Sequence, residues 1–384
     1  MPRRIAVLGA TGSVGRQALS VADYRGFRVE LLTADRTTGE LESLARAYRP
    51  AAVAMADETA AADLKLRLAD TPIRVYAGEE GICRAVEESE AETVVNAISG
   101  KAGLLPTLSV LYSGKRLALA NKESLVIAGE IVMRTAKDAG AEILPVDSEH
   151  SAIFQSLRSG KRSEISRILL TASGGPFFGW SREALAAVTP EQALAHPTWK
   201  MGKKITVDSA TLMNKGFEVI EAVHLFGVPA EKIEVVVHRE SILHSAVEFA
   251  DRTVIGEFSL PDMRSCVQYA VDYPDRDPSP LPPLDLAALG KLSFAKPDGE
   301  AFPLLPLAVR AISLGGAVPA VLNAADEIAV SAFLDRKLSF PGIAEVVETT
   351  VSHFEDLRAE HTLDGVLAAD RAARAYAESL VEAR

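Results

Sequence analysis

The fold class of this chain is decided by the stretch IAVLGATGSVG, residues 5–15. Its first four residues are apolar and predict a buried strand, and the residues from Gly15 onward have the spacing of a helix. Glycines at such a turn permit a tight bend and let backbone amides approach an anion at the positive end of the helix. The stretch therefore predicts a nucleotide-binding βα turn, with an ordinary glycine-rich turn as the alternative.

The alternation of strand and helix continues to residue 146. Short β-branched runs predict strands at 5–8, 28–34, 51–56, 73–77, 93–98, 116–120 and 142–146. Helical spacing occupies 15–22, 39–48, 58–69, 79–88, 103–113 and 124–138. Such alternation predicts an α/β domain built on a Rossmann-like, doubly wound parallel sheet.

Beyond residue 150 the pattern becomes mixed, which predicts an α+β region. Strands are expected at 167–173, 204–209, 235–238, 245–250 and 254–259, with the last ones as a candidate meander, and helices at 149–158, 181–186, 210–215 and 216–225. Residues 272–306 contain eight of the twenty prolines and predict an extended connector. Helical spacing at 304–314, 318–335, 340–355 and 363–382 predicts a small C-terminal helical bundle.

The composition limits the class of protein. The 384 residues carry a formal net charge of −11, so nucleic acid is not expected as a partner, because binding its phosphates needs a basic face. Two cysteines cannot form a disulfide framework, and no apolar run is long enough to span a bilayer. The N-terminus lacks the apolar core of a signal peptide. We therefore expect a cytoplasmic protein without a membrane partner.

The end of the second predicted strand bears on the choice of nucleotide. Asp35 and Arg36 follow it directly, and Thr37 comes next. An acid at this place holds the ribose hydroxyls of NAD, whereas an arginine accommodates the 2′-phosphate of NADP. The sequence leans toward NADP, and a solvated turn remains the alternative for Asp35.

Two carboxylates follow the predicted strand 142–146. On an extended segment Asp147 and Glu149 point to the same side and could hold one cation. Oxygen ligands favour Mg²⁺ or Mn²⁺ over zinc. The alternative is a helix N-terminus, with Asp147 or Ser148 as the cap and Glu149 in the first turn.

A second polar cluster occupies residues 196–221. Ser209, Asn214 and Lys215 are donors that suit a phosphate, and Glu218 is a candidate third carboxylate. Ser173, beside two glycines, also suits contact with a small anion. Non-functional interpretations remain for two of its features: Lys203 and Lys204 could be a solvent-exposed pair, and Trp199 could be a buried core residue.

The motifs GATGSVG, LALANKES (117–124), LPVDSEHSAIFQ (144–155), TASGGPF (171–177), HPTWKMGKKITVDSATLMNKGFEVIEA (196–222), SILHS (241–245), PDMR (261–264) and NAADEIAVSAFL (323–334) occur in this order. Together they resemble the 1-deoxy-D-xylulose 5-phosphate reductoisomerase family over almost the whole chain. The resemblance implies an NADPH- and metal-dependent oxidoreductase of the non-mevalonate isoprenoid pathway. Its cofactors would be NADPH and Mg²⁺ or Mn²⁺, with Co²⁺ as a further option.

The resemblance also implies site residues. The metal ligands would be Asp147, Glu149 and Glu218, and the residues nearest the chemistry Lys122, Glu149 and His196. Substrate would contact Ser148, Glu149, Ser173, His196, Trp199, Met201, Ser209, Asn214, Lys215 and Glu218, with residues 196–201 as a flexible flap and His150, His244, Pro261 and Met263 nearby. The cofactor would contact Thr11, Gly12, Ser13, Val14, Arg36, Thr37, Asn121, Glu123 and Gly202.

The implied reaction rearranges the carbon skeleton of the sugar phosphate on the metal and then reduces the aldehyde with NADPH to 2-C-methyl-D-erythritol 4-phosphate. The expected domains are an NADPH-binding domain at 1–147, a catalytic, metal-binding and dimerisation domain at 148–273, a connector at 274–302 and a helical domain at 303–384. The resemblance further implies a homodimer.

The sequence departs from the family pattern in three places. Asp35 stands where a glycine is usual and Thr37 near a usual asparagine, which puts the adenine-side contacts and the NADP preference in question. The usual HPQS reads His238-Arg239-Glu240-Ser241, and the usual LGxPDMR has lost its glycine.

Two other classes share part of the pattern. Semialdehyde and acyl-phosphate reductases also use GATGxVG but need a cysteine nucleophile, and neither Cys83 nor Cys266 has a fitting context. A dinucleotide-sensing protein without catalysis would need no third carboxylate.

Overall fold

The computed structural model describes residues 3–199, 201–357 and 362–384. By contacts within the chain these residues form two compact units. The first unit comprises residues 1–124, 132–151 and 262–283, and the second comprises 125–131, 152–261 and 284–384. The division of the sequence into four domains remains a prediction.

In the described part of the first unit a parallel sheet has seven strands in the order β4-β3-β2-β1-β5-β6-β7. The strands are β1 (Arg4–Leu8), β2 (Arg28–Ala34), β3 (Ala52–Met55), β4 (Arg74–Ala77), β5 (Thr93–Asn96), β6 (Arg116–Leu119) and β7 (Ile143–Pro145). The sheet begins at β1 and grows in both directions, which confirms the predicted doubly wound topology.

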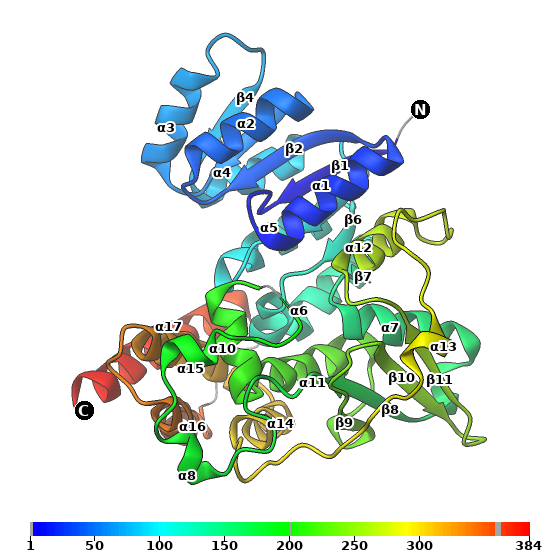
Figure 1. Cartoon of the computed structure of the whole chain (residues 1–384). Helices are drawn as coiled ribbons and strands as arrows, with labels where there is room; N and C mark the ends of the chain where they lie inside the picture. Colours follow the sequence, from blue (N-terminus) through cyan, green and yellow to red (C-terminus); the bar gives the residue numbers. More distant parts are fainter. Residues whose placement is uncertain (1–2, 200, 358–361) are drawn as a thin grey trace. The chain divides into compact units, whose positions relative to one another are not determined.

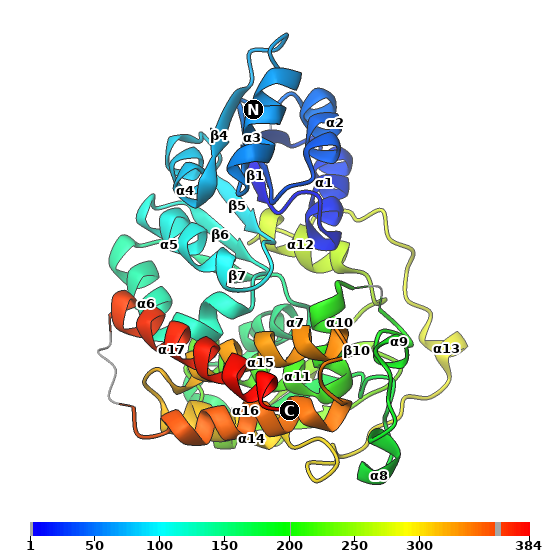
Figure 2. The ribbon, with the colours of Figure 1, turned by 90° about the vertical axis from the view of Figure 1, so that its left-hand side faces the viewer.

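Helices cover both faces of this sheet. They are α1 (Ser13–Arg25), α2 (Thr38–Tyr48), α3 (Glu58–Arg67), α4 (Gly78–Glu88), α5 (Leu104–Tyr112) and α6 (Glu123–Ala139), with the 3₁₀ turn η1 (Lys101–Gly103) before α5. Figure 2 shows α4 and α5 on one side of the strands and α1 and α2 on the other. The strands inside the sheet are therefore buried on both faces, which is why their sequences are mostly apolar rather than alternating, whereas the edge strand β4 is partly exposed.

One helix of the first unit comes from far along the chain. Helix α12 (Met263–Asp272), which the sequence did not indicate, lies beside α1 (Figure 2). Nε of Arg25, the last residue of α1, is 3.1 Å from the buried Asp272 carboxylate, and Arg3 donates a hydrogen bond to the carbonyl of Val271. A segment after residue 260 thus completes the nucleotide-type unit.

The second unit contains a mixed sheet whose described strands run β11-β10-β8-β9. They are β8 (Ile165–Ala172), β9 (Ile233–Val237), β10 (Leu243–Phe249) and β11 (Val254–Phe258). Strands β8 and β9 are parallel and the other pairs are antiparallel. The meander suggested for the last strands is wrong beyond the β10–β11 hairpin, because β8 lies between β9 and β10.

Helices form the rest of the second unit (Figure 1). They are α7 (Ser148–Ser156), which begins in the first unit, α8 (Arg182–Leu185), α9 (Pro190–Ala193), α10 (Lys203–Thr211), α11 (Met213–Phe226), α13 (Leu286–Leu289), α14 (Leu304–Leu314), α15 (Val318–Leu334), α16 (Phe340–Phe354) and α17 (Leu363–Glu382), with 3₁₀ turns η2 (Leu157–Ser159), η3 (Arg162–Glu164) and η4 (Ala230–Lys232).

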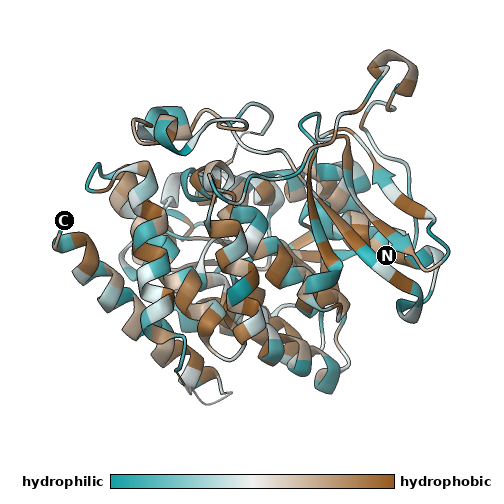
Figure 3. Ribbon diagram, turned by 90° about the horizontal axis from the view of Figure 1, so that it is seen from below, coloured by the Kyte–Doolittle hydropathy of each residue, from teal (hydrophilic) through white to brown (hydrophobic). Residues whose placement is uncertain are grey.

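One hydrophobic core joins the C-terminal helices to α10 and α11. Val207 of α10, Phe217 of α11, and Val321 and Phe333 of α15 are all at most 1 % exposed. Figure 3 shows that the helices of this region carry hydrophobic and hydrophilic bands along their length, as helices with one buried side do. The predicted helical bundle is therefore confirmed.

Residues 204–209 do not form the predicted strand, because they lie in α10. The β-branched run KITV imitates a strand, but residues 206–211 are all buried, so the sequence shows no amphipathic period. Gly202 caps the helix, Thr206 donates its hydroxyl hydrogen to the Gly202 carbonyl, and the Lys204 ammonium lies 2.6 Å from the Asp208 carboxylate one turn away. Tertiary packing overrides β-propensity at this place.

Among the described residues, no helix has both the length and the apolar character needed to cross a membrane.

Candidate active site

The glycine turn is shaped by two close backbone approaches. Gly9 has φ +76°, and a Cβ there would lie 2.6 Å from the Ala97 carbonyl oxygen. A Cβ at Gly15 would lie 2.2 Å from the carbonyl oxygen of Gly9, so the first turn of α1 sits directly on the loop. Gly12 is the N-cap residue of α1 and has no side chain to cap it. The turn therefore presents uncapped amides of the first helical turn, the arrangement that binds anions.

The residues expected on the adenine side lie next to this turn. The Thr37 hydroxyl donates a hydrogen bond to the Thr11 hydroxyl at 3.1 Å, which joins the ends of β1 and β2. Arg36 is exposed and pairs with Asp35, the two side-chain atoms being 3.0 Å apart. Asp35 thus orients the guanidinium that the sequence offers to a 2′-phosphate. Ser13 and Val14 form the first turn of α1.

Asn121 is buried and holds the loop after β5. Its amide nitrogen donates to the carbonyls of Ile98 and Gly100 at 2.8 and 2.9 Å and to the Glu123 carboxylate at 2.9 Å. A Cβ at Gly103 would lie 2.4 Å from the Asn121 side chain. Asn121 therefore shapes the loop at the carboxyl edge of the sheet, where doubly wound sheets bind ligands.

Asp147 lies between β7 and α7. The Ser151 amide donates a hydrogen bond to its carbonyl, so Asp147 occupies the N-cap position and Glu149 the first turn of α7. The predicted extended segment is wrong here, and the helix N-terminus is the local structure. The Lys122 ammonium, itself 7 % exposed, lies 2.6 Å from the Asp147 carboxylate. The Ser148 hydroxyl donates to Glu149 at 2.5 Å.

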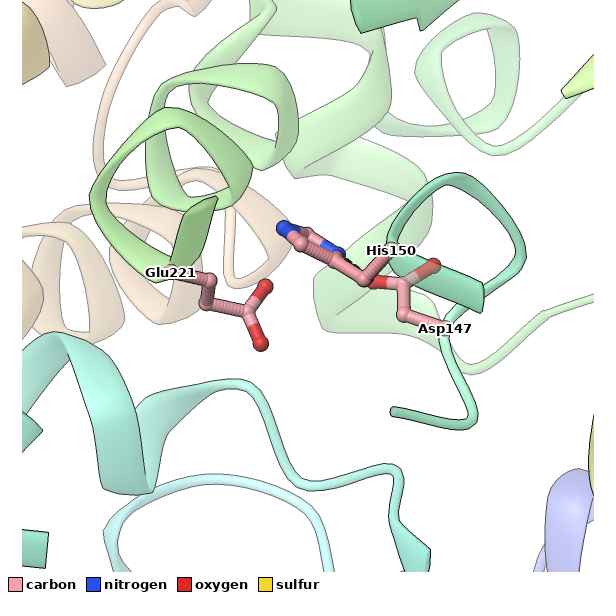
Figure 4. Close-up of side chains that lie close together, drawn as sticks. All are labelled: Asp147, His150 and Glu221. Carbon is pink, nitrogen blue, oxygen red and sulfur yellow. Dashed lines mark ion pairs between the residues drawn. The ribbon is translucent and has the colours of Figure 1, made fainter. Parts of the chain in front are cut away.

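Two sets of side chains offer metal-ligating atoms within 4.8 Å of one another. The first is the predicted set of Asp147, Glu149 and Glu218, and the second consists of Asp147, His150 and Glu221, drawn in Figure 4. The all-oxygen set suits a hard divalent ion such as Mg²⁺ or Mn²⁺. Glu221 ends the polar cluster 196–221 but was not predicted as a ligand, although its spacing of three residues from Glu218 on a helix indicated a shared face.

Glu218 lies in α11 and is 1 % exposed. One of its carboxylate oxygens accepts a hydrogen bond from the Asn214 amide at 2.6 Å, and the other forms an ion pair with the buried Lys215. The two donors expected to bind a phosphate thus lie within one helical turn of the expected third metal ligand. A buried carboxylate needs such partners because its desolvation is costly.

Ser173 and His196 contact each other at the start of the glycine loop that follows β8. The Ser173 hydroxyl oxygen is 3.0 Å from Nε2 of His196, whose Nδ1 accepts hydrogen bonds from the amides of Thr198 and Trp199. Because Nδ1 is an acceptor, a neutral ring carries its proton on Nε2 and donates it to Ser173. Burial, and next the charge of Arg239, lowers the pKa of His196 to about 4. The imidazole is therefore neutral at physiological pH.

Ser209 lies in the last turn of α10 and is brought close to the glycine loop. A Cβ at Gly175, which has φ +63°, would lie 2.6 Å from the Ser209 carbonyl oxygen. Within the expected flap, the Trp199 ring centroid is 6.3 Å from that of the buried His244. Met201 is half-buried, Gly202 caps α10, and Lys200 lies outside the described residues.

The departure at residues 238–241 has a structural role. His238 is 1 % exposed, its Nδ1 donates to the Ser293 carbonyl, and its Nε2 accepts from the amides of Ile242 and Leu243. Glu240 accepts a hydrogen bond from the Ser293 hydroxyl. This turn therefore fastens the connector to the end of β9.

Three family patterns cover most of the chain: "1-deoxy-D-xylulose 5-phosphate reductoisomerase" matches residues 5–129, its "C-terminal domain" 143–226, and "DXP reductoisomerase C-terminal domain" 258–376. A relative of that name from Xanthomonas axonopodis pv. citri is 50% identical over 382 residues, 98% of this chain and 96% of the relative.

Two solved structures are similar over nearly their whole length. The reductoisomerase of Zymomonas mobilis in complex with NADPH has a TM-score of 0.93 and 42% identity, with 100% of both chains covered. A DOX-P reductoisomerase in complex with NADPH, fosmidomycin and magnesium has a TM-score of 0.94 and 37% identity, with 99% of this chain and 98% of that chain covered.

Proposed function

The chain belongs to the 1-deoxy-D-xylulose 5-phosphate reductoisomerase family, and on that premise we propose that it converts 1-deoxy-D-xylulose 5-phosphate to 2-C-methyl-D-erythritol 4-phosphate with NADPH and a divalent metal ion. The observation that carries the proposal is the set of three carboxylates, Asp147, Glu149 and Glu218, whose oxygens gather within 4.8 Å. A protein that only senses a dinucleotide has no need of such a set.

The residues present fit the two groups that the reaction needs. Asp147, Glu149 and Glu218 would hold Mg²⁺, Mn²⁺ or Co²⁺, and the turn from Thr11 to Val14 would hold the pyrophosphate of NADPH. When bound, the metal ion supplies Lewis-acid polarisation of the substrate oxygens and NADPH supplies the hydride. Arg36 and Thr37, which follow β2 at the place where a 2′-phosphate would bind, support the preference for NADP. The carboxylate of Asp35 pairs with the Arg36 guanidinium and holds it there.

The side chains around these groups have separate tasks in the proposed reaction. Lys122 pairs with Asp147 and would move a proton at the substrate's reacting end. Ser173, Ser209, Asn214 and Lys215 would anchor the phosphate through hydroxyl, amide and ammonium donors. His196 stays neutral and orients the Ser173 hydroxyl. Trp199 and Met201 would close over the substrate and exclude water from the aldehyde.

The rival reductases that form a thioester are disfavoured by the state of both cysteines. Burial, and next the charge of Glu79, raises the pKa of the Cys83 thiol to about 11, so the nucleophilic thiolate is scarce at neutral pH. Cys266 is 4 % exposed within α12. The Cys83 thiol is therefore a poor nucleophile, and Cys266 is buried in a helix, whereas acyl transfer requires an accessible, reactive thiolate.

We further infer a cytoplasmic homodimer paired through the catalytic region. In support, both cysteines are free thiols, and strand β11 forms an edge of its sheet with Val254 and Phe258 49% and 46% exposed. Exposed apolar residues on an edge strand are typical of surfaces that pair with another chain.

The proposal is tested by following NADPH oxidation with 1-deoxy-D-xylulose 5-phosphate in the presence of Mg²⁺ or Mn²⁺. We expect turnover that stops with EDTA and returns when excess metal is added. A double Cys83→Ser, Cys266→Ser variant should keep this activity. Absence of turnover with either metal, or loss of it in the cysteine variant, would refute the assignment.

A further inference from the structure

Arg239 lies where two parallel strands end side by side. Ala172, the last residue of β8, pairs with Val237, the last residue of β9, and the His238 amide donates to the Ala172 carbonyl at 2.7 Å. Ser173 therefore continues from one strand end and Arg239 from its neighbour. This register brings an arginine to the glycine loop that carries Ser173.

The Arg239 side chain turns toward that loop. One guanidinium nitrogen lies 3.4 Å from the Gly175 carbonyl oxygen, and the guanidinium carbon lies 5.2 Å from the centroid of the Phe178 ring. Gly174 and Gly175 both have positive φ, a backbone conformation that glycine adopts without a steric penalty. Arg239 thus contacts two points of the loop downstream of Ser173.

The charge of Arg239 is not neutralised by a neighbour. Within the described residues its guanidinium makes no ion pair with an acidic side chain, and Glu240 is turned to Ser293 and His238. The charges of the other cations of the region are partly neutralised, because Lys215, which is also expected to contact the phosphate, pairs with Glu218, and Lys204 pairs with Asp208 and Asp326. The positive charge of Arg239 also acts on His196, the partner of Ser173, because it helps to lower the pKa of that imidazole.

We propose that Arg239 is a positioning residue of the substrate site, which holds the Ser173–Phe178 loop and supplies the unpaired positive charge that draws a phosphate dianion to it. The inference rests on the proposed function, in which Ser173 binds the substrate phosphate. It also accounts for how a chain with a net charge of −11 attracts an anion. At physiological ionic strength charges farther away than about 8 Å are largely screened, so a nearby cation outweighs the distant acidic surface.

The test compares Arg239→Gln and Arg239→Lys with Arg371→Gln, a matched control on α17. Arg371 is exposed and makes no side-chain hydrogen bond or ion pair within the described residues, so its replacement removes the same charge without a contact. Binding of inorganic phosphate is measured by NMR titration at about 0.02 M and about 0.3 M salt, and the ring of His196 is titrated in each protein.

We expect Arg239→Gln to weaken phosphate binding about fivefold at the low salt concentration and by less than about twofold at the high one, because salt screens a charge at this exposure. The pKa of His196 should rise in Arg239→Gln and stay at about 4 in Arg239→Lys and in the Arg371→Gln control. Arg239→Lys should restore most of the phosphate affinity, since the charge remains.

Two outcomes would overturn the inference: phosphate affinity in Arg239→Gln equal to that of Arg371→Gln, or a loss that is the same at both salt concentrations and is not restored by lysine. Neither measurement requires turnover. A protein that bound phosphate as expected but oxidised no NADPH would refute the proposed reaction and leave the role of Arg239 intact.

Discussion

Glu218 is almost fully buried, and both of its carboxylate oxygens accept hydrogen bonds or ion pairs from the same helix. Asn214 and Lys215 therefore fix the rotamer of the side chain before any ligand arrives. Preorganisation of this kind is what a metal ligand requires, because a mobile carboxylate loses entropy on binding. The Glu218 carboxylate of the proposed metal site is therefore a buried charge whose position is set by Asn214 and Lys215.

Replacement of Glu218 by Gln is expected to lower metal-dependent NADPH oxidation by about a hundredfold or more, because a ligand charge is lost from a three-carboxylate set. Mg²⁺ affinity, measured by calorimetry, should fall by about tenfold or more. Lys215 would lose its counter-charge, so we also expect a stability loss of about 3 kcal/mol in denaturant unfolding. Glu231→Gln, an exposed change in η4, is the control. Wild-type metal affinity in the Gln variant would contradict the assignment.

Helix α1 packs directly against the glycine loop that precedes it, so a change in the helix also moves the loop. Gly15→Ala would place a methyl group 2.2 Å from the Gly9 carbonyl oxygen, which forces helix and loop apart. We expect about tenfold weaker NADPH binding by fluorescence titration and a stability loss of about 1–3 kcal/mol. Gly39→Ala, in α2, has open space and should be neutral or stabilising. Equal NADPH affinity in the two variants would contradict the claim that close packing of Gly15 against the Gly9 carbonyl shapes the cofactor-binding loop.

Helices α10 and α15 are joined by Lys204, whose ammonium lies 2.6 Å from Asp208 and 2.8 Å from Asp326. Two carboxylates share one cation, and burial raises the pKa of the fully buried Asp326 above its usual 3.8. The unfolded chain therefore releases this proton at lower pH than the folded chain. The contribution of Asp326 to stability consequently decreases as the pH rises above about 4.

Asp326→Asn should accordingly stabilise the protein at neutral pH, by about 1–2 kcal/mol, since Lys204 keeps Asp208 as its partner. The difference from wild type should shrink toward pH 4, which thermal unfolding at a series of pH values will measure. Asp335→Asn, an exposed change at the end of α15, should show no such trend. A variant that is less stable than wild type at every pH would show that the ion pair outweighs the burial.

At the scale of the whole molecule the proposed dimer is the property to test. Light scattering coupled to size-exclusion chromatography should give twice the mass of one chain. Phe258→Arg, which places a charge on the exposed edge strand β11, should shift the equilibrium toward the monomer by about tenfold or more. Leu66→Arg, at an exposed position of α3, is the matched control. A mass that is unchanged by Phe258→Arg would exclude this edge as the interface.

Much of the fold could be predicted because it depends on neighbours in sequence. Strand β2 and helix α14 have the bounds that their sequence patterns predict, and the glycines at residues 9–15 indicate a tight turn by their spacing alone. The candidate site residues of the long motifs came from the family resemblance rather than from local pattern, and their roles remain predictions. Helix α12 was not predicted, because its place beside α1 depends on a segment about 240 residues away.

The sequence by itself determined the parallel sheet, the nucleotide-type turn and the types of side chain available to a metal and a phosphate, since local periodicity and chemistry are written in consecutive residues. Only the tertiary structure decided that residues 203–211 form a helix, that Glu218 is fastened by Asn214 and Lys215, and that Arg239 meets the loop of Ser173. These outcomes depend on burial and on strand register, which bring together residues that no local rule connects.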